Sequence, residues 1–254
     1  MEQSTILPNP DEIATISLHE RCEQRFIEFV NVTRLDIVVP AIFVAIVVFF
    51  FVGDETHLLP SGLSIVVTQA IVYFIGLWFV IFPHRALFVE LLRGDLNTRA
   101  MWIYGLAPIA IMFLGLVAVL LSLPTNEPIR QLAPNLMFHR RDIAGALFAP
   151  FGEEIVFRVW LQTRLQQGLG RVGELFGGAR LRAWFSAAGA FLCGLLFLAN
   201  HANGFEAWSI YAFAAWVTWL RYRHGSLGAT LIAHTGWNAA LLLLGILILT
   251  HVLK

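Results

Sequence analysis

Three ionisable residues, Glu153, Glu154 and Arg158, stand close together inside an apolar stretch of the sequence. A charged side chain at the centre of a bilayer costs about 2.5–3.5 kcal/mol, so in a membrane these residues should face a polar interior and neutralise one another. Glu154 and Arg158 are spaced i and i+4 on one helix face, in the favourable order for an ion pair. Glu153 points about 100° away around the helix, and it is left as the carboxylate that can accept a proton.

Two further motifs place histidine and asparagine among apolar residues. His201 follows Phe197, and Asn238 follows His234, each at a spacing of i and i+4. His234 and Asn238 therefore share one helix face, and both can donate hydrogen bonds to a developing oxyanion. His201 and Glu153 could together hold and deprotonate a water molecule. We expect Phe197 to be a pocket wall or part of the core.

Each group also has a purely structural interpretation. The two glutamates and the arginine could form a salt-bridge network that only fixes helix packing. His201 could lie at the membrane interface, and His234 and Asn238 could form a hydrogen-bonded clamp between helices. The set favours a catalytic site because its two glutamates, two histidines and asparagine lie on three of the last four apolar segments.

The composition of the 254-residue chain indicates a membrane protein. Hydrophobic residues make up 58% of it and charged residues 13%, whereas soluble domains carry about 25% charged residues. The net charge is zero, so nothing indicates nucleic acid as a partner. Cys22 and Cys193 lack CxxC spacing, and we expect neither a disulfide nor a cysteine metal site.

Apolar runs predict an all-α fold, a polytopic transmembrane helix bundle of about seven spans, because a spanning helix needs about 20 mostly apolar residues. The last four spans hold nearly all of the polar residues within apolar runs, so we expect the catalytic core there. The predicted spans are Leu35–Val52, Leu63–Phe82, Met101–Leu123, Asp142–Gln162, Ala183–His201, Ala207–Leu220 and Leu227–Leu253.

We divide the chain into a cytosolic or interfacial segment (residues 1–34), a three-helix membrane scaffold (35–141) and the core that holds the candidate catalytic residues (142–254). Residues Asp11–Val30 could form an amphipathic helix that lies against the bilayer. The glycine-rich stretch Gly168–Gly178 is predicted to be a loop. Most arginines fall in segments that are cytoplasmic when the N-terminus is cytoplasmic, so the positive-inside rule predicts this orientation. We expect the protein in the cell (inner) membrane.

Taken in order, these motifs resemble those of the CAAX protease and bacteriocin-processing family, which includes the Ras-converting endopeptidase. The resemblance covers about residues 142–253 and implies a glutamate-type intramembrane endopeptidase. The matching motifs are Glu153-Glu154-xxx-Arg158, Phe197-xxx-His201 and His234-xxx-Asn238. The roles it implies are water activation by Glu153 and His201, oxyanion binding by His234 and Asn238, and support of the site by Glu154 and Arg158.

The expected partners are membrane lipids and a membrane-associated protein or peptide substrate, with no nucleic acid. We expect no cofactor and favour no metal, although Glu153, His201 and His234 could ligate zinc. Two other functions stay open. A proton-coupled transporter also uses buried glutamate and histidine, but we see no repeated half in the sequence. A non-catalytic membrane scaffold or immunity protein could keep the same fold.

Overall fold

The computed structural model describes the chain in several separate stretches, and every structural statement below concerns these residues. They are 18–42, 44, 78, 81–122, 143–201 and 207–251. Within them the structure is helical and contains no strand, which confirms the predicted all-α fold. Its elements are α2 (Leu18–Val32), η1 (Phe82–His84), α5 (Arg85–Arg93), α6 (Thr98–Ser122), α8 (Ile143–Glu154), η2 (Ile155–Leu161), α9 (Gln162–His201), α10 (Ala207–His224) and α11 (Leu227–His251).

Three helical stretches among the described residues are long and apolar enough to cross a membrane. They are Thr98–Gly115, Ala149–Ala199 and Leu227–Leu244. Large apolar side chains on their outer faces are exposed, among them Ile111 on α6 and Phe191 on α9. Such surface is stable against lipid but not against water. The first two predicted spans lie mostly outside the described residues, so the number of seven spans stays a prediction.

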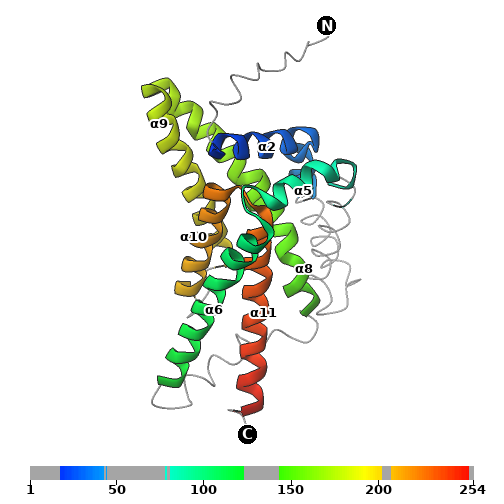
Figure 1. Cartoon of the computed structure of the whole chain (residues 1–254), viewed down its shortest axis with the longest axis vertical. Helices are drawn as coiled ribbons and strands as arrows, with labels where there is room; N and C mark the ends of the chain where they lie inside the picture. Colours follow the sequence, from blue (N-terminus) through cyan, green and yellow to red (C-terminus); the bar gives the residue numbers. More distant parts are fainter. Residues whose placement is uncertain are drawn as a thin grey trace.

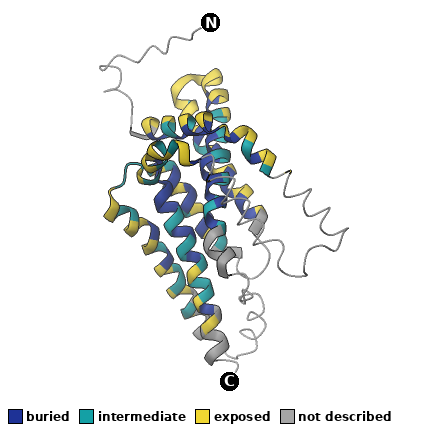
Figure 2. Ribbon diagram, turned by 90° about the vertical axis from the view of Figure 1, so that its right-hand side faces the viewer, coloured by how far each residue is buried: buried dark blue, intermediate teal, exposed yellow. Residues whose placement is uncertain are grey.

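Helix α11 is the central helix of the bundle and packs against α6, α8, α10 and α5 (Figure 1). It approaches α6 closely because glycines stand at the contact. A Cβ atom on Gly236 would lie 2.8 Å from Ile109, and one on Gly105 would lie 2.6 Å from Ile232. Small residues permit such close packing in membranes. Figure 2 shows that the buried residues gather inside the bundle, in the part nearest α2.

Helix α9 folds back on itself, and the predicted loop Gly168–Gly178 is wrong. The helix continues to the break at Gly177 and Gly178, where Gly178 has a φ of 68°. The earlier glycines serve the contact between the two arms. A Cβ atom on Gly173 would lie 2.5 Å from the Leu181 carbonyl oxygen. Only the last two glycines therefore reverse the chain, whereas Gly170 and Gly173 face the second arm at the helix–helix contact.

Helix α2 lies across one end of the bundle, and α11 runs toward the opposite end (Figure 1). The predicted N-terminal helix is therefore present from Leu18 onward. Phe26 holds α2 in place, because its ring centre lies 3.3 Å from the guanidinium carbon of the buried Arg221. Arg221 also donates a hydrogen bond from Nη2 to the Thr163 hydroxyl at 3.1 Å. This contact joins α2 to both α10 and the start of α9.

Candidate active site

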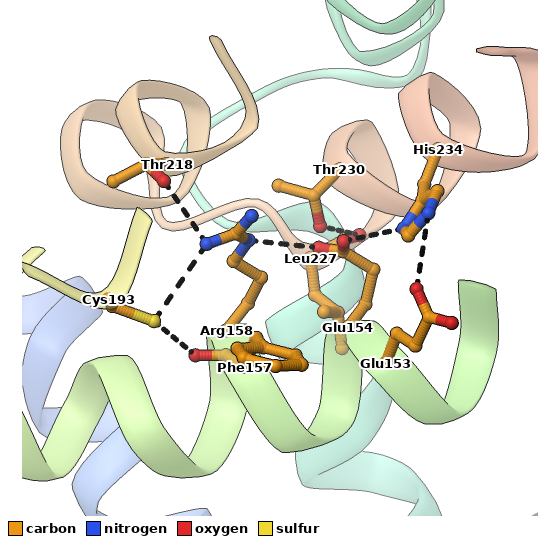
Figure 3. A network of polar contacts seen from close by, with 9 residues as sticks. All are labelled: Glu153, Glu154, Phe157, Arg158, Cys193, Thr218, Leu227, Thr230 and His234. Atoms are coloured by element: carbon orange, nitrogen blue, oxygen red, sulfur yellow. Dashed lines mark hydrogen bonds and ion pairs between the residues drawn. The ribbon is translucent and has the colours of Figure 1, made fainter. Parts of the chain in front are cut away.

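Glu154 is the buried centre of a polar network between η2, α8 and α11 (Figure 3). Its side chain has no exposed surface. Its Oε2 atom lies 3.5 Å from Arg158 Nε, and its Oε1 atom lies 2.9 Å from His234 Nδ1. The ion pair predicted from the i and i+4 spacing is present, and the same carboxylate also contacts a histidine on another helix.

Arg158 connects this carboxylate to the neighbouring helices α9 and α10. Its Nη1 atom donates a hydrogen bond to the Thr218 hydroxyl at 3.1 Å and lies 3.8 Å from Cys193 Sγ. Its guanidinium carbon lies 4.9 Å from the centre of the Phe197 ring, within cation–π range. Thr218 and Cys193 were not predicted as site residues, because a single polar residue in an apolar run has no spacing that marks it.

His234 lies between two carboxylates, because its Nε2 atom is 3.4 Å from Glu153 Oε2 while Nδ1 faces Glu154. A neutral imidazole has one N–H group and can donate to only one of them. With a neutral His234 and two ionised glutamates, only one of the two contacts can therefore be a hydrogen bond. Both are hydrogen bonds when one more proton is present, either on the second ring nitrogen of His234 or on one of the two carboxyl groups. The arrangement can move a proton from one side of His234 to the other.

The two glutamates differ in their access to the surroundings. The Glu153 side chain is 28% exposed, whereas His234 is 5% exposed and Glu154 is fully buried. A reacting molecule can therefore reach Glu153 first. Glu154 is held by Arg158 and can only orient His234 and balance its charge.

The backbone leaves the regular α-helix directly after Glu154. The predicted fourth span is divided into α8 and the π-helix η2, in which the Gln162 N–H donates to the Phe157 carbonyl. The same carbonyl accepts a hydrogen bond from the Cys193 thiol at 3.0 Å. π-Helical turns often occur at functional sites. Here the wider turn lies between the two glutamates and the helix α9 that follows.

Aromatic rings enclose His234. The Phe197 ring lies edge-on to it at 5.6 Å, and the Phe213 ring lies 5.1 Å away. Phe197 is 1% exposed and also meets Phe157 edge-to-face at 5.2 Å. Phe197 belongs to the buried cluster with Phe213 and Trp237, and its role as a substrate-pocket wall stays a prediction. The rings keep His234 in one orientation and exclude bulk water from its sides.

The two remaining predicted site residues lie on α11 and at the end of α9. Asn238 is half-buried and lies one helical turn after His234 on α11. His201 is the last residue of α9, and its side chain lies outside the described residues. The described part of the chain contains no group of three residues that could hold a metal ion. The alternative zinc site would need His201 as its third ligand.

An apolar groove runs between the second arm of α9 and α10. It has a volume of about 430 Å³, and small side chains such as Ala190, Gly194 and Ala214 form part of its lining. Thr218 lies in the same lining and accepts the hydrogen bond from Arg158. The groove therefore adjoins the polar network and is within the size range of ligand pockets, about 300–1,000 Å³.

Comparison with known proteins agrees with the motifs. A family model described as type II CAAX prenyl endopeptidase Rce1-like matches residues 141–240, a range that includes both glutamates of the network, His234 and Asn238. No curated protein and no solved structure gave a significant match to the chain. The chain is an integral membrane protein with several apolar helices. Over residues 141–240 the chain is similar to the Rce1-like type II CAAX prenyl endopeptidases.

Proposed function

We propose that this protein is an intramembrane endopeptidase that hydrolyses a peptide bond in a membrane-associated protein or peptide. The observation that carries the proposal is the placement of His234 between Glu153 and Glu154, with Arg158 as the buried counter-ion. Such a group can accept a proton, hold it and return it. The family match supports peptide hydrolysis as the reaction.

In the proposed reaction, Glu153 takes a proton from water, and the water oxygen bonds to the scissile carbonyl carbon. His201 is the second group that positions this water. Asn238 and His234 donate hydrogen bonds to the oxyanion of the tetrahedral intermediate. The proton then passes to the leaving nitrogen as the C–N bond breaks, which gives a carboxylic acid and an amine. Glu154 acts through His234 and touches no reacting atom.

The groove between α9 and α10 supports a substrate with a hydrophobic anchor. Its apolar lining suits a lipid chain or a transmembrane segment, and its contact with Arg158 through Thr218 places such an anchor beside the polar network. A substrate held there would bring the adjoining peptide to Glu153. We propose that the core over residues 142–254 binds and cleaves the substrate and that residues 35–141 serve as its scaffold.

We also propose that the end of the bundle covered by α2 faces the cytoplasm, in the cell (inner) membrane. The arginine distribution favours this orientation. Arg164 in the first arm of α9 contacts Asn31 of α2, and Arg171 and Arg182 line a cleft together with Glu23 of α2. The scissile bond would then be cleaved near the cytoplasmic side.

The experiment compares membrane peptides from cells that contain the wild-type chain or the Glu153→Gln variant. We expect cleavage products that are present with the wild type and absent with Glu153→Gln. Glu174→Gln is the matched control, because Glu174 loses the same charge at an exposed position where it pairs with Arg182. The control should cleave as the wild type does.

Two outcomes would contradict the proposal. Cleavage that continues in a correctly folded Glu153→Gln protein would show that this carboxylate is not the base. Identical peptide profiles from membranes with and without the wild-type chain would refute the proposed peptidase activity altogether. Loss of activity on treatment with a chelator, with zinc present in the purified protein, would favour a metal mechanism instead.

A further inference from the structure

Buried polar side chains form a continuous file along η2 and the first arm of α9. Glu154, Arg158, Gln162 and Gln166 repeat every four residues, and each has no exposed surface. Residues at this spacing lie on one helix face. At about 1.5 Å per residue the file extends for roughly 15–18 Å, from the carboxylate beside His234 toward the end of the bundle where α2 lies.

Several side-chain atoms of this file make no hydrogen bond to protein, although Glu154 Oε2 and Arg158 Nε face each other in the ion pair at 3.5 Å. Within the described stretches, every buried side-chain nitrogen or oxygen without a hydrogen bond belongs to these four residues or to Arg221. An unsatisfied buried polar group costs about 1–3 kcal/mol, and such groups in native proteins usually bond to ordered water. The atoms are Glu154 Oε2, Arg158 Nε and Nη2, Gln162 Oε1 and Nε2, Gln166 Oε1 and Arg221 Nε.

A polar cleft lies at the far end of the file. It has a volume of about 230 Å³ and lies between α2 and the two arms of α9. Gln166 forms part of its lining and donates a hydrogen bond to the Ser186 hydroxyl, which faces it from the second arm, at 3.4 Å. Glu23 and Arg182 line the same cleft. The cleft is wide enough for several water molecules, each of which takes about 30 Å³.

We propose that this file is a water channel that connects the polar cleft beneath α2 with Glu154 and His234. Its ligand is water, held by the free amide atoms of Gln162 and Gln166 and by the guanidinium of Arg158. The inference rests on the proposed function, since peptide hydrolysis consumes one water for each bond cleaved. A substrate would cover Glu153 on its exposed side, whereas the file reaches the same site from within the helix bundle.

The alternative is a dry file whose polar groups are simply unpaired. The two cases differ in the effect of Gln162→Met, which keeps the length of the side chain and removes both amide atoms. In a dry file this change removes two unsatisfied groups and stabilises the protein. In a water channel it interrupts the hydrogen-bonded path between Arg158 and Gln166.

The test is hydroxyl-radical labelling of the full chain in lipid nanodiscs, read by mass spectrometry. Cys193 is the reporter, because it has no exposed surface and lies beside Arg158. Radicals formed from buried water should oxidise Cys193 in the wild type. We expect Gln162→Met to reduce this oxidation by roughly fivefold or more, and Gln162→Asn, which remains polar, to retain most of it. Gln167→Met is the matched control, since Gln167 lines the same cleft but lies off the file, where it accepts a hydrogen bond from Arg164.

The proposed channel would be refuted if Cys193 stays unoxidised in the wild type. It would also be refuted if Cys193 is oxidised equally in Gln162→Met and Gln167→Met. Gln166→Met is the second variant and should show the same loss if Gln162→Met does not fold. The labelling requires no catalysis, so its result is independent of the proposed function. If cleavage depends on Glu153 but the labelling shows a dry file, the proposed peptidase function still holds and only the proposed water channel is refuted.

Discussion

Replacement of Arg158 by methionine tests the polar network most directly. Methionine fills much of the space of the arginine stem, while the ion-pair contact with Glu154, the hydrogen bond to Thr218 and the contact with the Phe197 ring are all lost. Glu154 then keeps His234 and the Thr230 hydroxyl as hydrogen-bond partners, in a position with no exposed surface. The change therefore leaves a buried carboxylate without its counter-ion.

Removal of one partner of a buried ion pair costs about 3–5 kcal/mol. We expect Arg158→Met to lower the free energy of unfolding by this amount, which is a large part of the roughly 5–15 kcal/mol of a typical domain. The double variant Glu154→Gln/Arg158→Met replaces both charges. It should lie within about 2 kcal/mol of the wild type, because a neutral pair of similar volume avoids the buried charge.

The measurement is reversible unfolding in mixed detergent micelles with increasing SDS, followed by tryptophan fluorescence. Glu154→Gln alone completes the double-mutant cycle and gives the coupling free energy between the two side chains. A loss below about 1 kcal/mol in Arg158→Met, the value of an exposed pair, would refute a buried and mutually dependent pair. A double variant as unstable as Arg158→Met would show that lost packing, and not the unpaired carboxylate, causes the effect.

Four further results are expected. Glu153→Gln should lower kcat by about 10²–10⁴, the contribution of a general base, with little change in unfolding; an equal loss in Glu174→Gln would contradict the assignment. Gly189→Ala should cost about 1–3 kcal/mol in thermal unfolding, because its Cβ would lie 2.7 Å from the Leu165 backbone. Gly168→Ala, where no atom lies within 4 Å, should instead gain up to about 1 kcal/mol. Alkaline phosphatase, which is active only outside the cytoplasm, should be inactive when fused before α2; an active fusion there would reverse the proposed orientation.

The sequence alone was sufficient for the features that depend on local spacing. The all-α fold and helices α6, α10 and α11 follow from apolar runs of sufficient length. The Glu154–Arg158 pair follows from the i and i+4 spacing, because both side chains lie on the same helix face whatever surrounds them. The selection of His234 followed from its place in an apolar segment, where a polar residue needs a partner.

Only the tertiary structure decided which helix faces meet. Nothing in the linear sequence indicates that the two ring nitrogens of His234 face two different glutamates, or that Thr218 accepts a hydrogen bond from Arg158. These contacts depend on the rotation of η2 against α10 and α11, and the backbone of η2 is a π-helical turn. Helix rotation is a property of the assembled bundle, because each side chain takes the position that its neighbours on other helices leave open.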